Sequence, residues 1–406
     1  MLTYRYEARN SSTGEKIKAA VQADNEQVAA KLLKDQGLTL LSIKLDRSLS
    51  GNRFYKKVRA KDKVLFSRQL ATLINAGLPL VQSLRSVADQ TTAKPLKVVI
   101  NEVITDVEGG KSFSYALAKH PRVFNKVFIS LVAAAETSGT LDKGLERLAD
   151  QQEKDADIMS KVRGAMIYPA IVLLVMAVVV GFMIVKVLPQ VQSIYAGLKG
   201  VSLPLVTRIM LGVSHFATHY WWIVIILIIL VVVGGARANR TAMGKSVIDT
   251  LKMKTWPFGP LFMKMYMARF ARTGTTLVAS GVPLLQVLDI TGDAVDNVHI
   301  KHSLLMAADK VKGGKSLADA LSNDSNFLEL VPNMIRIGEQ SGALEVMLDK
   351  VAVYYEKEVD NEIKAISTII EPVLMIIMGA VALTIVAAVL LPIYGLVNQS
   401  GFLNNV

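Results

Sequence analysis

The most suggestive short motif for chemistry is GGKS, which occurs twice, at Gly109–Ser112 and at Gly313–Ser316. Glycines before a Lys-Ser pair are typical of phosphate-binding loops, whose successive backbone N–H groups surround the phosphates. Such a loop also needs a glycine five residues before the Gly-Lys pair, where this chain has Thr105 and Asp309. Neither copy follows a predicted parallel strand. We therefore interpret both motifs as a helix end followed by a serine that caps the next helix.

Two further groups of residues have types that can bind metal ions. His215 and His219 are four residues apart, which can place both imidazoles on one metal, but no acidic residue or cysteine lies nearby. A membrane-interface helix is the better interpretation of that pair. The acidic run contains Asp150, Glu153, Asp155 and Asp157, interleaved with lysines. It predicts a solvated helix face, with a cation site at a subunit contact as the alternative.

Glu371 is an acidic residue in an unusual place, directly before Pro372 at the start of an apolar segment. A charge there is costly unless it is hydrated or paired. The side chain either lies in water at the headgroup boundary or is tied to another helix or subunit, and the sequence leaves both readings open. No nucleophile–base pair has catalytic spacing. The sequence therefore predicts no enzyme activity, no cofactor and no metal site.

The composition is that of a protein with both membrane and polar parts. The chain has 406 residues, of which 51% are hydrophobic, and a mean hydropathy of +0.38. It carries 46 basic and 34 acidic residues, a formal charge of +12, and no cysteine, which excludes disulfides and thiolate chemistry. Basic residues on a membrane protein suggest cytoplasmic surfaces near anionic lipid. No nucleic-acid-binding motif accompanies the charge, so nucleic acid is not an expected partner.

Three segments are apolar enough to cross a bilayer, which takes about 20 residues of helix. Gly164–Leu188 contains a single charge, Lys186; Ile209–Ala236 contains none, and none follows Glu371. We expect transmembrane helices at 164–188, 220–236 and 365–395, an external loop and interfacial segment at 189–219, and an external tail at 396–406. Positive charges cluster before the first span and after the second, whereas the loop between them holds only Lys199 and Arg208. The positive-inside rule therefore places the N-terminus and both large polar regions in the cytoplasm, and the C-terminus outside.

A long internal repeat organises most of the chain. Phe66, Arg68, Leu73, Gly77, Pro79 and Gln82 match Phe270, Arg272, Leu277, Gly281, Pro283 and Gln286 with a shift of 204 residues. ETSGTL at Glu136–Leu141 returns as EQSGAL at Glu339–Leu344, and Pro169 returns as Pro372, both with a shift of 203. The motif positions that we select are Gly77, Pro79, Glu136, Gly139, Pro169, Gly281, Pro283, Glu339, Gly342, Glu371 and Pro372. The repeated unit is a polar domain together with the span that follows it.

Each copy is predicted to be helical, at 62–163 and at 237–364. Gly77 and Gly281 end one helix and are expected to have positive φ, and the proline two residues later suits the first turn of the next helix. No glycine or proline interrupts Ala343 to Glu371, which predicts a helix reaching about 40 Å from the membrane. Residues 1–45 predict a strand–strand–helix–strand module. The basic linker at 46–61 is interpreted as a tether, with a lipid-binding or partner-binding arm as the alternative.

Taken together, the duplicated helical domain, the three spans, AGLPLVQSL and SGVPLLQVL, ETSGTL and EQSGAL, and the YP and EP dipeptides resemble one known family. These are the inner-membrane platform proteins of type II secretion and type IV pilus machines (GspF/PilC-like). The resemblance implies a mainly α-helical fold with a six-helix bundle in each copy, and no enzymatic activity. It also implies a homo-oligomer whose partners are a hexameric assembly ATPase, pilin or pseudopilin subunits, inner-membrane assembly proteins and membrane lipid.

Two functions from different classes follow. The first is a mechanical adaptor that couples ATP hydrolysis elsewhere to pilin or pseudopilin polymerisation, with the first copy and its N-terminal module as the main ATPase contact. The alternative is a transporter or channel built on a parallel repeat, which would need charged or broken helices at mid-membrane. Lys186 and Glu371 lie near span ends, which favours the adaptor.

Overall fold

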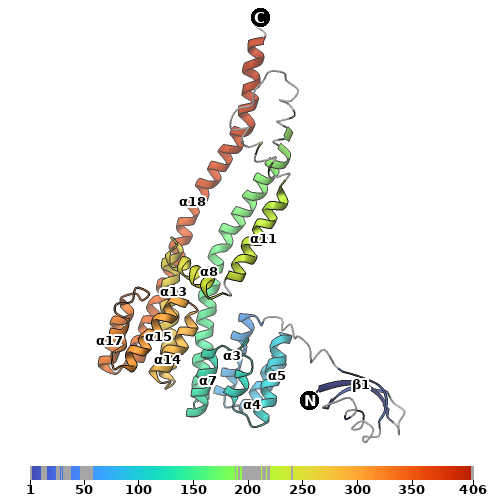
Figure 1. Ribbon diagram of the computed structural model, residues 1–406, viewed down its shortest axis with the longest axis vertical. Coiled ribbons are helices and arrows are strands. Elements are labelled where there is room, and N and C mark those ends of the chain that lie inside the picture. The colour runs from blue at the N-terminus through green and yellow to red at the C-terminus, as the bar shows by residue number, and fades with distance from the viewer. Residues whose placement is uncertain are drawn as a thin grey trace. The chain divides into compact units, whose positions relative to one another are not determined.

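The structure, a computed structural model, describes residues 2–10, 16–23, 38–45, 58–187, 220–238 and 241–403, with isolated positions between these ranges (Figure 1). The chain forms two compact units, one made by Met1–Arg59 and the other by almost all of the remaining residues. Helices dominate the second unit, and all the strands belong to the first within the described ranges. The mainly α-helical class predicted from the repeat is confirmed.

The first unit contains a three-stranded antiparallel sheet. Its strands are β1 (Leu2–Asn10), β2 (Lys16–Ala23) and β3 (Leu38–Leu45), and β1 lies in the centre, in the order β2-β1-β3. The central strand pairs with both neighbours, and a bulge interrupts its pairing with β3 between Glu7 and Ala8. The helix expected between β2 and β3 lies largely outside the described residues.

The first copy of the repeat folds into six helices. They are α3 (Ala60–Asn75), α4 (Leu80–Gln90), α5 (Lys94–Glu108), α6 (Phe113–Ala118), α7 (Lys126–Ser138) and α8 (Leu141–Phe182). Phe66, Phe124 and Phe128 pack against one another with tilted rings; the centroids are 5.7 Å apart for Phe66 and Phe124 and 4.8 Å apart for Phe124 and Phe128. All three rings are almost fully buried. Burial of such apolar side chains is the main stabilising contribution to a bundle of this kind.

The second copy has six helices in the same order. They are α13 (Phe258–Ala279), α14 (Leu284–Val295), α15 (Val298–Lys312), α16 (Leu317–Leu321), α17 (Leu330–Ser341) and α18 (Leu344–Leu403). Phe270, the repeat partner of Phe66, packs edge-on against Phe327 with centroids 5.3 Å apart. Two helices precede this bundle, α11 (Trp221–Ala238) and α12 (Ala242–Lys254). Two six-helix bundles are therefore present, as the resemblance implied.

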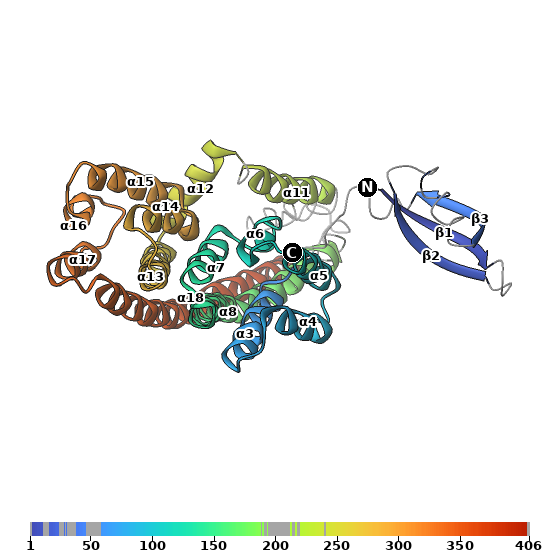
Figure 2. The ribbon, with the colours of Figure 1, turned by 90° about the horizontal axis from the view of Figure 1, so that it is seen from below.

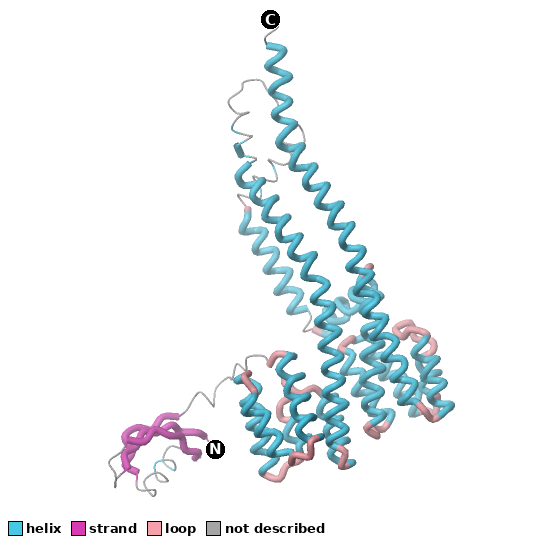
Figure 3. Tube along the Cα trace, turned by 180° about the vertical axis from the view of Figure 1, so that it is seen from behind, coloured by secondary structure: helices cyan, strands magenta, loops and turns pink. Residues whose placement is uncertain are grey.

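Bundle and span are not separate pieces, because one helix forms part of both. α8 runs without a break from the first bundle into the first apolar segment and continues as a π-helical turn, Met183–Val187. α18 likewise runs without a break, over 60 residues, from the second bundle into the last apolar segment (Figures 1 and 3). Leu141–Val187 and Leu344–Leu390 are long and apolar enough to cross a membrane. The boundaries expected at residues 163/164 and 364/365 therefore fall inside continuous helices.

The end of the expected linker also differs from the structure. α18 extends through Leu403, into the segment 396–406 that is predicted to be an external tail. The linker predicted to end at residue 61 ends earlier, since α3 begins at Ala60. The loop expected at 189–219, which contains His215 and His219, lies mostly outside the described residues. The first unit also ends near this linker, at Arg59.

The twin Gly-x-Pro turns have the backbone that their residues predict. Gly77 has φ of +84° and Gly281 has φ of +77°, so the expected positive φ is confirmed at both. An added Cβ would meet no atom within 4 Å at either glycine, so only the backbone conformation requires glycine there. Pro79 and Pro283 are the N-cap residues of α4 and α14 and not first-turn residues as expected. Their extended ψ angles explain this one-residue difference.

The paired prolines of the spans lie inside helices. Pro169 is a buried residue of α8, and Pro372 lies in the interior of α18. A proline in a helix removes one backbone hydrogen bond, and such a helix survives where neighbouring packing or the bilayer compensates. Glu371 is exposed on α18. Within the described ranges no hydrogen bond or ion pair holds its carboxylate, and both readings of this residue stay predictions.

Candidate functional site: the joint between the two bundles

The GGKS motif and the ETSG or EQSG motif of each copy meet in space. In the first bundle, Glu136 accepts hydrogen bonds from the backbone N–H of Phe113 (2.7 Å) and of Ser114 (3.1 Å). Ser112 is the N-cap of α6, as predicted, because its side chain accepts from the N–H of Tyr115. The orphan N–H groups at the start of α6 are thus satisfied by a serine and a carboxylate.

The second bundle repeats this arrangement. Glu339 accepts from the N–H of Leu317 (2.6 Å) and of Ala318 (3.1 Å), and Ser316 accepts from the N–H of Asp319. An anion is favoured at a helix N-terminus, and here the chain supplies its own. The N–H groups that a phosphate would need are therefore already used. This supports the interpretation of GGKS as a helix cap.

Gly139 and Gly342 complete the motifs. Both have φ of +69° and end the helices that carry Glu136 and Glu339. A left-handed residue at this position is the usual way to stop a helix and turn the chain. The turn leads directly into α8 or α18, so the motif sets where each long helix begins.

Arg68 binds the start of the first long helix to α3. Its guanidinium forms a bidentate pair with Glu153 (2.7 and 2.6 Å) and also reaches Glu146 (2.8 Å) and Asp150. Bidentate Arg–carboxylate pairs are the strongest and most directional of ion pairs. Hydrogen bonding to Glu153 and Asp150 raises the pKa of Arg68, and the guanidinium lowers the pKa of Glu153 below its ordinary value.

Arg272 makes the equivalent contacts in the second bundle. It forms a bidentate pair with Glu356 (2.7 and 3.0 Å) and reaches Asp349 (2.6 Å). Glu356 and Asp349 lie 203 residues after Glu153 and Glu146, the shift of the sequence repeat. Each bundle is therefore fastened to its long helix by the same arginine and the same pair of acidic positions.

The acidic run of α8 is consequently not a simple solvated face. Asp150 and Glu153 pair with Arg68, Asp155 lies 3.7 Å from Arg269, and Asp157 pairs with Lys161 at 2.8 Å. Arginine and lysine side chains of the same chain thus pair with the carboxylates that the alternative interpretation assigns to a bound cation. Among the described residues, no group of three or more His, Asp or Glu side chains is arranged to hold a metal ion.

α8 also joins the two bundles. Gln151 of α8 donates its side-chain amide to the hydroxyl of Thr273 on α13 over 2.9 Å, and both residues are buried. Around this bond lie ion pairs between the copies: Lys126 with Asp289 (2.6 Å) and Asp293 (3.1 Å), Lys161 with Asp360 (2.9 Å), and Arg147 with Glu345 (4.0 Å). Ile158, Val162 and Ala165 of α8 pack against the core of the second bundle.

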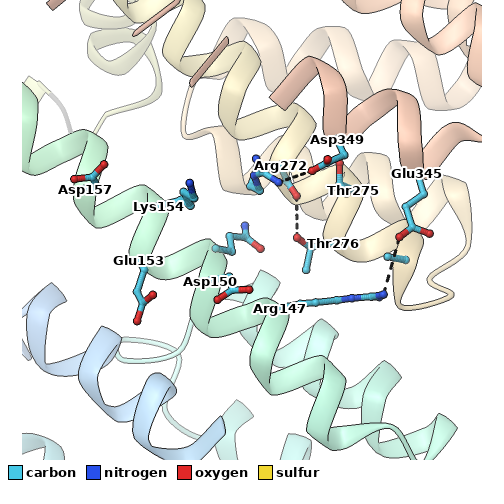
Figure 4. Close-up of a pocket in the computed structure, with 12 residues that line it drawn as sticks. Arg147, Asp150, Glu153, Lys154, Asp157, Arg272, Thr275, Thr276, Glu345 and Asp349 are labelled. Atoms are coloured by element: carbon cyan, nitrogen blue, oxygen red, sulfur yellow. Dashed lines mark hydrogen bonds and ion pairs between the residues drawn. The ribbon is translucent and has the colours of Figure 1, made fainter. Parts of the chain in front are cut away.

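A polar cavity of about 480 Å³ lies in this joint (Figure 4). Its walls come from α8, α13 and α18, and Arg147 extends from α8 toward Glu345 (Figure 4). Five carboxylates and three cationic side chains line it: Asp150, Glu153, Asp157, Glu345, Asp349, Arg147, Lys154 and Arg272. Several of these charges are paired across the cavity walls, such as Arg272 with Asp349 (2.6 Å) and Arg147 with Glu345 (4.0 Å). The cavity lining thus helps to hold α8, α13 and α18 together.

Sequence reasoning selected some of these residues and missed others. Four of the residues selected from the sequence take part in helix caps and helix ends: Glu136, Gly139, Glu339 and Gly342. The sequence marks Arg68 and Arg272 only as matching positions of the repeat, and it contains no signal for the pairing of Gln151 with Thr273. Equal spacing of acidic residues after the two arginines in the repeat is the signal that could have found the arginine pairs.

Comparison with known proteins gives the same duplicated pattern. The family model described as "Type II secretion system (T2SS), protein F" matches twice, at residues 66–189 and 270–392. The model of the N-terminal domain of the same protein matches residues 1–44. The double match has the register of the repeat found in the sequence, and its two segments include most of the residues of both bundles.

Full-length relatives extend the match to nearly the whole chain. A "Type IV pilus assembly protein PilC" of Thermus thermophilus is 36% identical over 404 residues, covering 98% of this chain and 99% of the relative. The protein of the same name in Myxococcus xanthus is 36% identical, covering 97% and 94%. A "Type II secretion system protein F" of Pseudomonas aeruginosa is 33% identical, covering 98% and 99%. The chain therefore belongs to the type II secretion system protein F family, which includes the type IV pilus assembly proteins PilC.

Proposed function

We propose that this chain is the inner-membrane platform of a type IV pilus or type II secretion machine. In this role it couples a hexameric cytoplasmic ATPase to the polymerisation of pilin or pseudopilin subunits. The observation that carries the proposal is the continuity of α8 and α18 from a polar bundle into an apolar segment. A helix packed along its length moves as a rigid element, so displacement of a bundle is passed to the segment in the bilayer.

The contacts between the bundles support a membrane topology with three spans. Lys126 pairs with Asp289, and Gln151 bonds Thr273, and these contacts support placing both bundles on the same side of the membrane. α8 carries the chain across once, and the chain must return before the second bundle. α11 is an apolar helix in the right place for that return. α18 then crosses again and leaves the C-terminus on the other side.

The joint explains how two bundles could act as one body. The arginine pairs hold each bundle to its long helix, and the Gln151–Thr273 bond and surrounding ion pairs hold the bundles to each other. A force applied to either bundle would reach both long helices. This favours the adaptor over the transporter alternative, which needs polar groups within the spans.

Orientation and partner binding test the proposal separately. The chain has no cysteine, so Ser11→Cys and Ser400→Cys give single labelling sites in an otherwise unmodified protein. We expect a membrane-impermeant maleimide to label them from opposite sides of the inner membrane, and labelling from the same side would contradict the three spans. The detergent-extracted full chain should retain an assembly ATPase and prepilin-like proteins. Failure to retain either would favour the transporter.

The proposed ATPase contact is the first bundle with its N-terminal module. Separate fragments are a poor test, because α8 packs against the core of the second bundle and fragments would expose that surface. A photoreactive phenylalanine analogue at Tyr115 or Tyr354, 52% and 49% exposed, samples each bundle in the full chain. We expect crosslinks to the ATPase from position 115. Crosslinks from position 354 alone would reverse the assignment of roles.

A further inference from the structure

α12 presents an apolar stripe outward. Met243, Val247 and Leu251 lie four residues apart on one face of this 13-residue helix and are 83%, 56% and 58% exposed. Residues at this spacing share one side of a helix. Trp256, just past the helix, is 74% exposed. We call Met243, Val247 and Leu251 the α12 stripe; water-facing helices ordinarily carry polar residues at such positions.

The opposite face of α12 is bound to the second bundle by polar groups. Asp249 is fully buried and accepts from the backbone N–H of Val298 at the start of α15 (3.1 Å). Lys245 pairs with Asp296 (2.7 Å) on the same face, and Thr250, at the edge of the stripe, is hydrogen-bonded to His299 (2.9 Å). The helix therefore cannot turn its apolar stripe inward without breaking these bonds. Met253 of α12 also packs against the core of the second bundle, so the helix is attached by apolar as well as polar contacts.

α12 follows α11 through a tight turn. The Thr241 backbone N–H and side-chain hydroxyl both donate to the carbonyl of Ala238, the last residue of α11 (3.0 and 2.9 Å). A Cβ on Gly244 would lie 2.3 Å from that same carbonyl oxygen. The first turn of α12 thus packs directly on the end of α11. Figure 2 shows α12 between α11 and the helices of the second bundle.

Positive charge surrounds the stripe. Arg237 is in the last turn of α11, and Lys254 is in the last turn of α12, on the side of the stripe. Lys252, in the same turn, points to the other face and pairs with the buried Asp249 (3.3 Å). An open apolar groove of about 440 Å³ continues beside Trp256, lined in part by Met263 and Lys264. Tryptophan and basic residues flanking an apolar helix face are the composition of helices that lie in a membrane interface.

We propose that α12 is an interfacial membrane helix that rests its stripe on the cytoplasmic leaflet and anchors the second bundle to anionic lipid. The inference rests on α11 being the second span, as proposed above, because that span delivers the start of α12 to the membrane surface. Helices of this type bury their apolar face about 5–10 Å into the headgroup and acyl boundary. Lys254 and Arg237 would lie at the level of the phosphates, where they attract anionic headgroups.

Lipid is favoured over a protein partner for two reasons. The α11–α12 turn fixes the helix at the end of an apolar segment, whereas a protein-docking face needs no such attachment. The positive charges of Arg237, before α12, and of Lys254, at its end, also complement the negative charge of a cytoplasmic leaflet. The second bundle would then be held to the bilayer at two places, α12 and α18. Movement of that bundle would tilt or displace α18 without detaching the bundle from the membrane.

Depth-dependent fluorescence quenching tests this in the full chain. Single-cysteine variants Met243→Cys, Val247→Cys and Leu251→Cys are labelled with an environment-sensitive dye and reconstituted into vesicles of phosphatidylethanolamine and phosphatidylglycerol. The lipids carry a nitroxide either near the headgroup or deep in the acyl chain. We expect strong quenching by the shallow nitroxide at all three positions, and weaker quenching by the deep one.

Two matched positions make the outcomes distinct. Val346→Cys is a control with similar exposure, 51%, on α18 about 37 Å of helix before Glu371, and should not be quenched. Leu230→Cys, 64% exposed on α11, should be quenched by the deep nitroxide. Quenching at 230 without quenching at 243, 247 and 251 overturns the interfacial helix alone. Absence of quenching at 230 overturns the second span, and the interfacial helix with it.

A protein covering the stripe would give a different result. The dye on Val247→Cys would then show a blue-shifted emission in detergent solution, and lipid nitroxides would not quench it in vesicles. That outcome overturns the lipid assignment in favour of a second copy of the chain. Replacing phosphatidylglycerol with phosphatidylcholine is expected to reduce shallow quenching at 251 more than at 243. Lys254 lies about one helical turn after position 251 on the same side of α12, which is the reason for this difference.

Discussion

The side-chain amide of Gln151 donates to the hydroxyl of Thr273 over 2.9 Å, and this bond links two copies of a repeat that begin about two hundred residues apart. Both side chains are buried, so neither can exchange its partner for solvent. A buried polar group that loses its partner costs about 1–3 kcal/mol, whereas loss of both partners is nearly neutral. The bond therefore makes correct docking of the bundles more favourable than a shifted arrangement.

Thr273→Val should lower the free energy of unfolding by about 1–3 kcal/mol, because it leaves the Gln151 amide buried without an acceptor. Thermal or denaturant unfolding of the full chain in detergent measures the change. Thr276→Val on the same helix is the control, since that hydroxyl bonds only the carbonyl of Arg272 in its own helix. The double variant Gln151→Leu/Thr273→Val should recover part of the loss. A double variant less stable than either single one would argue against a coupled pair.

Glu136→Ala and Glu339→Ala should each destabilise their bundles by about 1–3 kcal/mol, because two backbone N–H groups at a helix start lose a charged acceptor. Glu136→Gln and Glu339→Gln should cost less, since one amide oxygen remains. Glu329→Gln provides the control, because Glu329 is exposed and its side chain makes no cap hydrogen bond. Equal effects at Glu329 and Glu339 would show that the carboxylate caps contribute nothing specific.

Gly77→Val and Gly281→Val should each destabilise their bundles by about 1–2 kcal/mol, because a Cβ is disfavoured at the positive φ of these turns. Space is not the cause, since an added Cβ meets no atom within 4 Å. Insertion into the membrane should be unchanged. Gly164→Val, also in open space but inside α8, is the matched control and should show only a small helix-propensity effect. Comparable losses at all three sites would contradict the backbone explanation.

Acid should weaken the attachment of α3 to α8. Because Arg68 lowers the pKa of Glu153 below its ordinary value of 4.5, the pair stabilises the fold above that pH. This contribution is lost as the pH falls through the lowered pKa. The difference in Tm between the native chain and Arg68→Gln should therefore shrink from about pH 7 to about pH 3.5. Arg122→Gln, at a residue without an ion pair in the described ranges, should show a pH-independent difference.

The purified chain should not hydrolyse ATP, because carboxylates occupy the N–H groups next to both GGKS motifs. Lys111→Ala and Lys315→Ala should therefore leave any background phosphate release unchanged, measured with the protein in detergent and in vesicles. Lys111 instead lies over the ring of Tyr115, 5.9 Å from its centroid. Turnover that disappears in either lysine variant would contradict the cap interpretation.

Much of the fold could be predicted because it is encoded locally. Gly77 and Gly281 end helices through their own φ angles. Ser112 and Ser316 each cap a helix by accepting a hydrogen bond from the backbone N–H three residues later. The apolar segments of α8 and α18 are recognisable from length and composition alone. The repeat could be found because both copies preserve these local signals with a nearly constant shift.

The candidate site could not be predicted in the same way, because its contacts join distant parts of the chain. Arg68 meets carboxylates 78 to 85 residues away, and Glu136 caps a helix that starts 23 residues before it. The sequence contains 34 acidic residues, and local patterns do not say which of them reaches a given arginine. Helix packing decides that choice by bringing one face of α8 against α3 and α13.

The α12 stripe shows the same division. The sequence by itself determined a helix with Met243, Val247 and Leu251 on one side, because helical periodicity is a property of neighbouring residues. Only the tertiary structure decided that this side faces outward, because Asp249 is buried against α15 and holds the polar side inward. Periodicity identifies the two faces of a helix. Which face is covered depends on the free energy of contacts with residues far away in the chain, and those contacts exist only once the bundles have assembled.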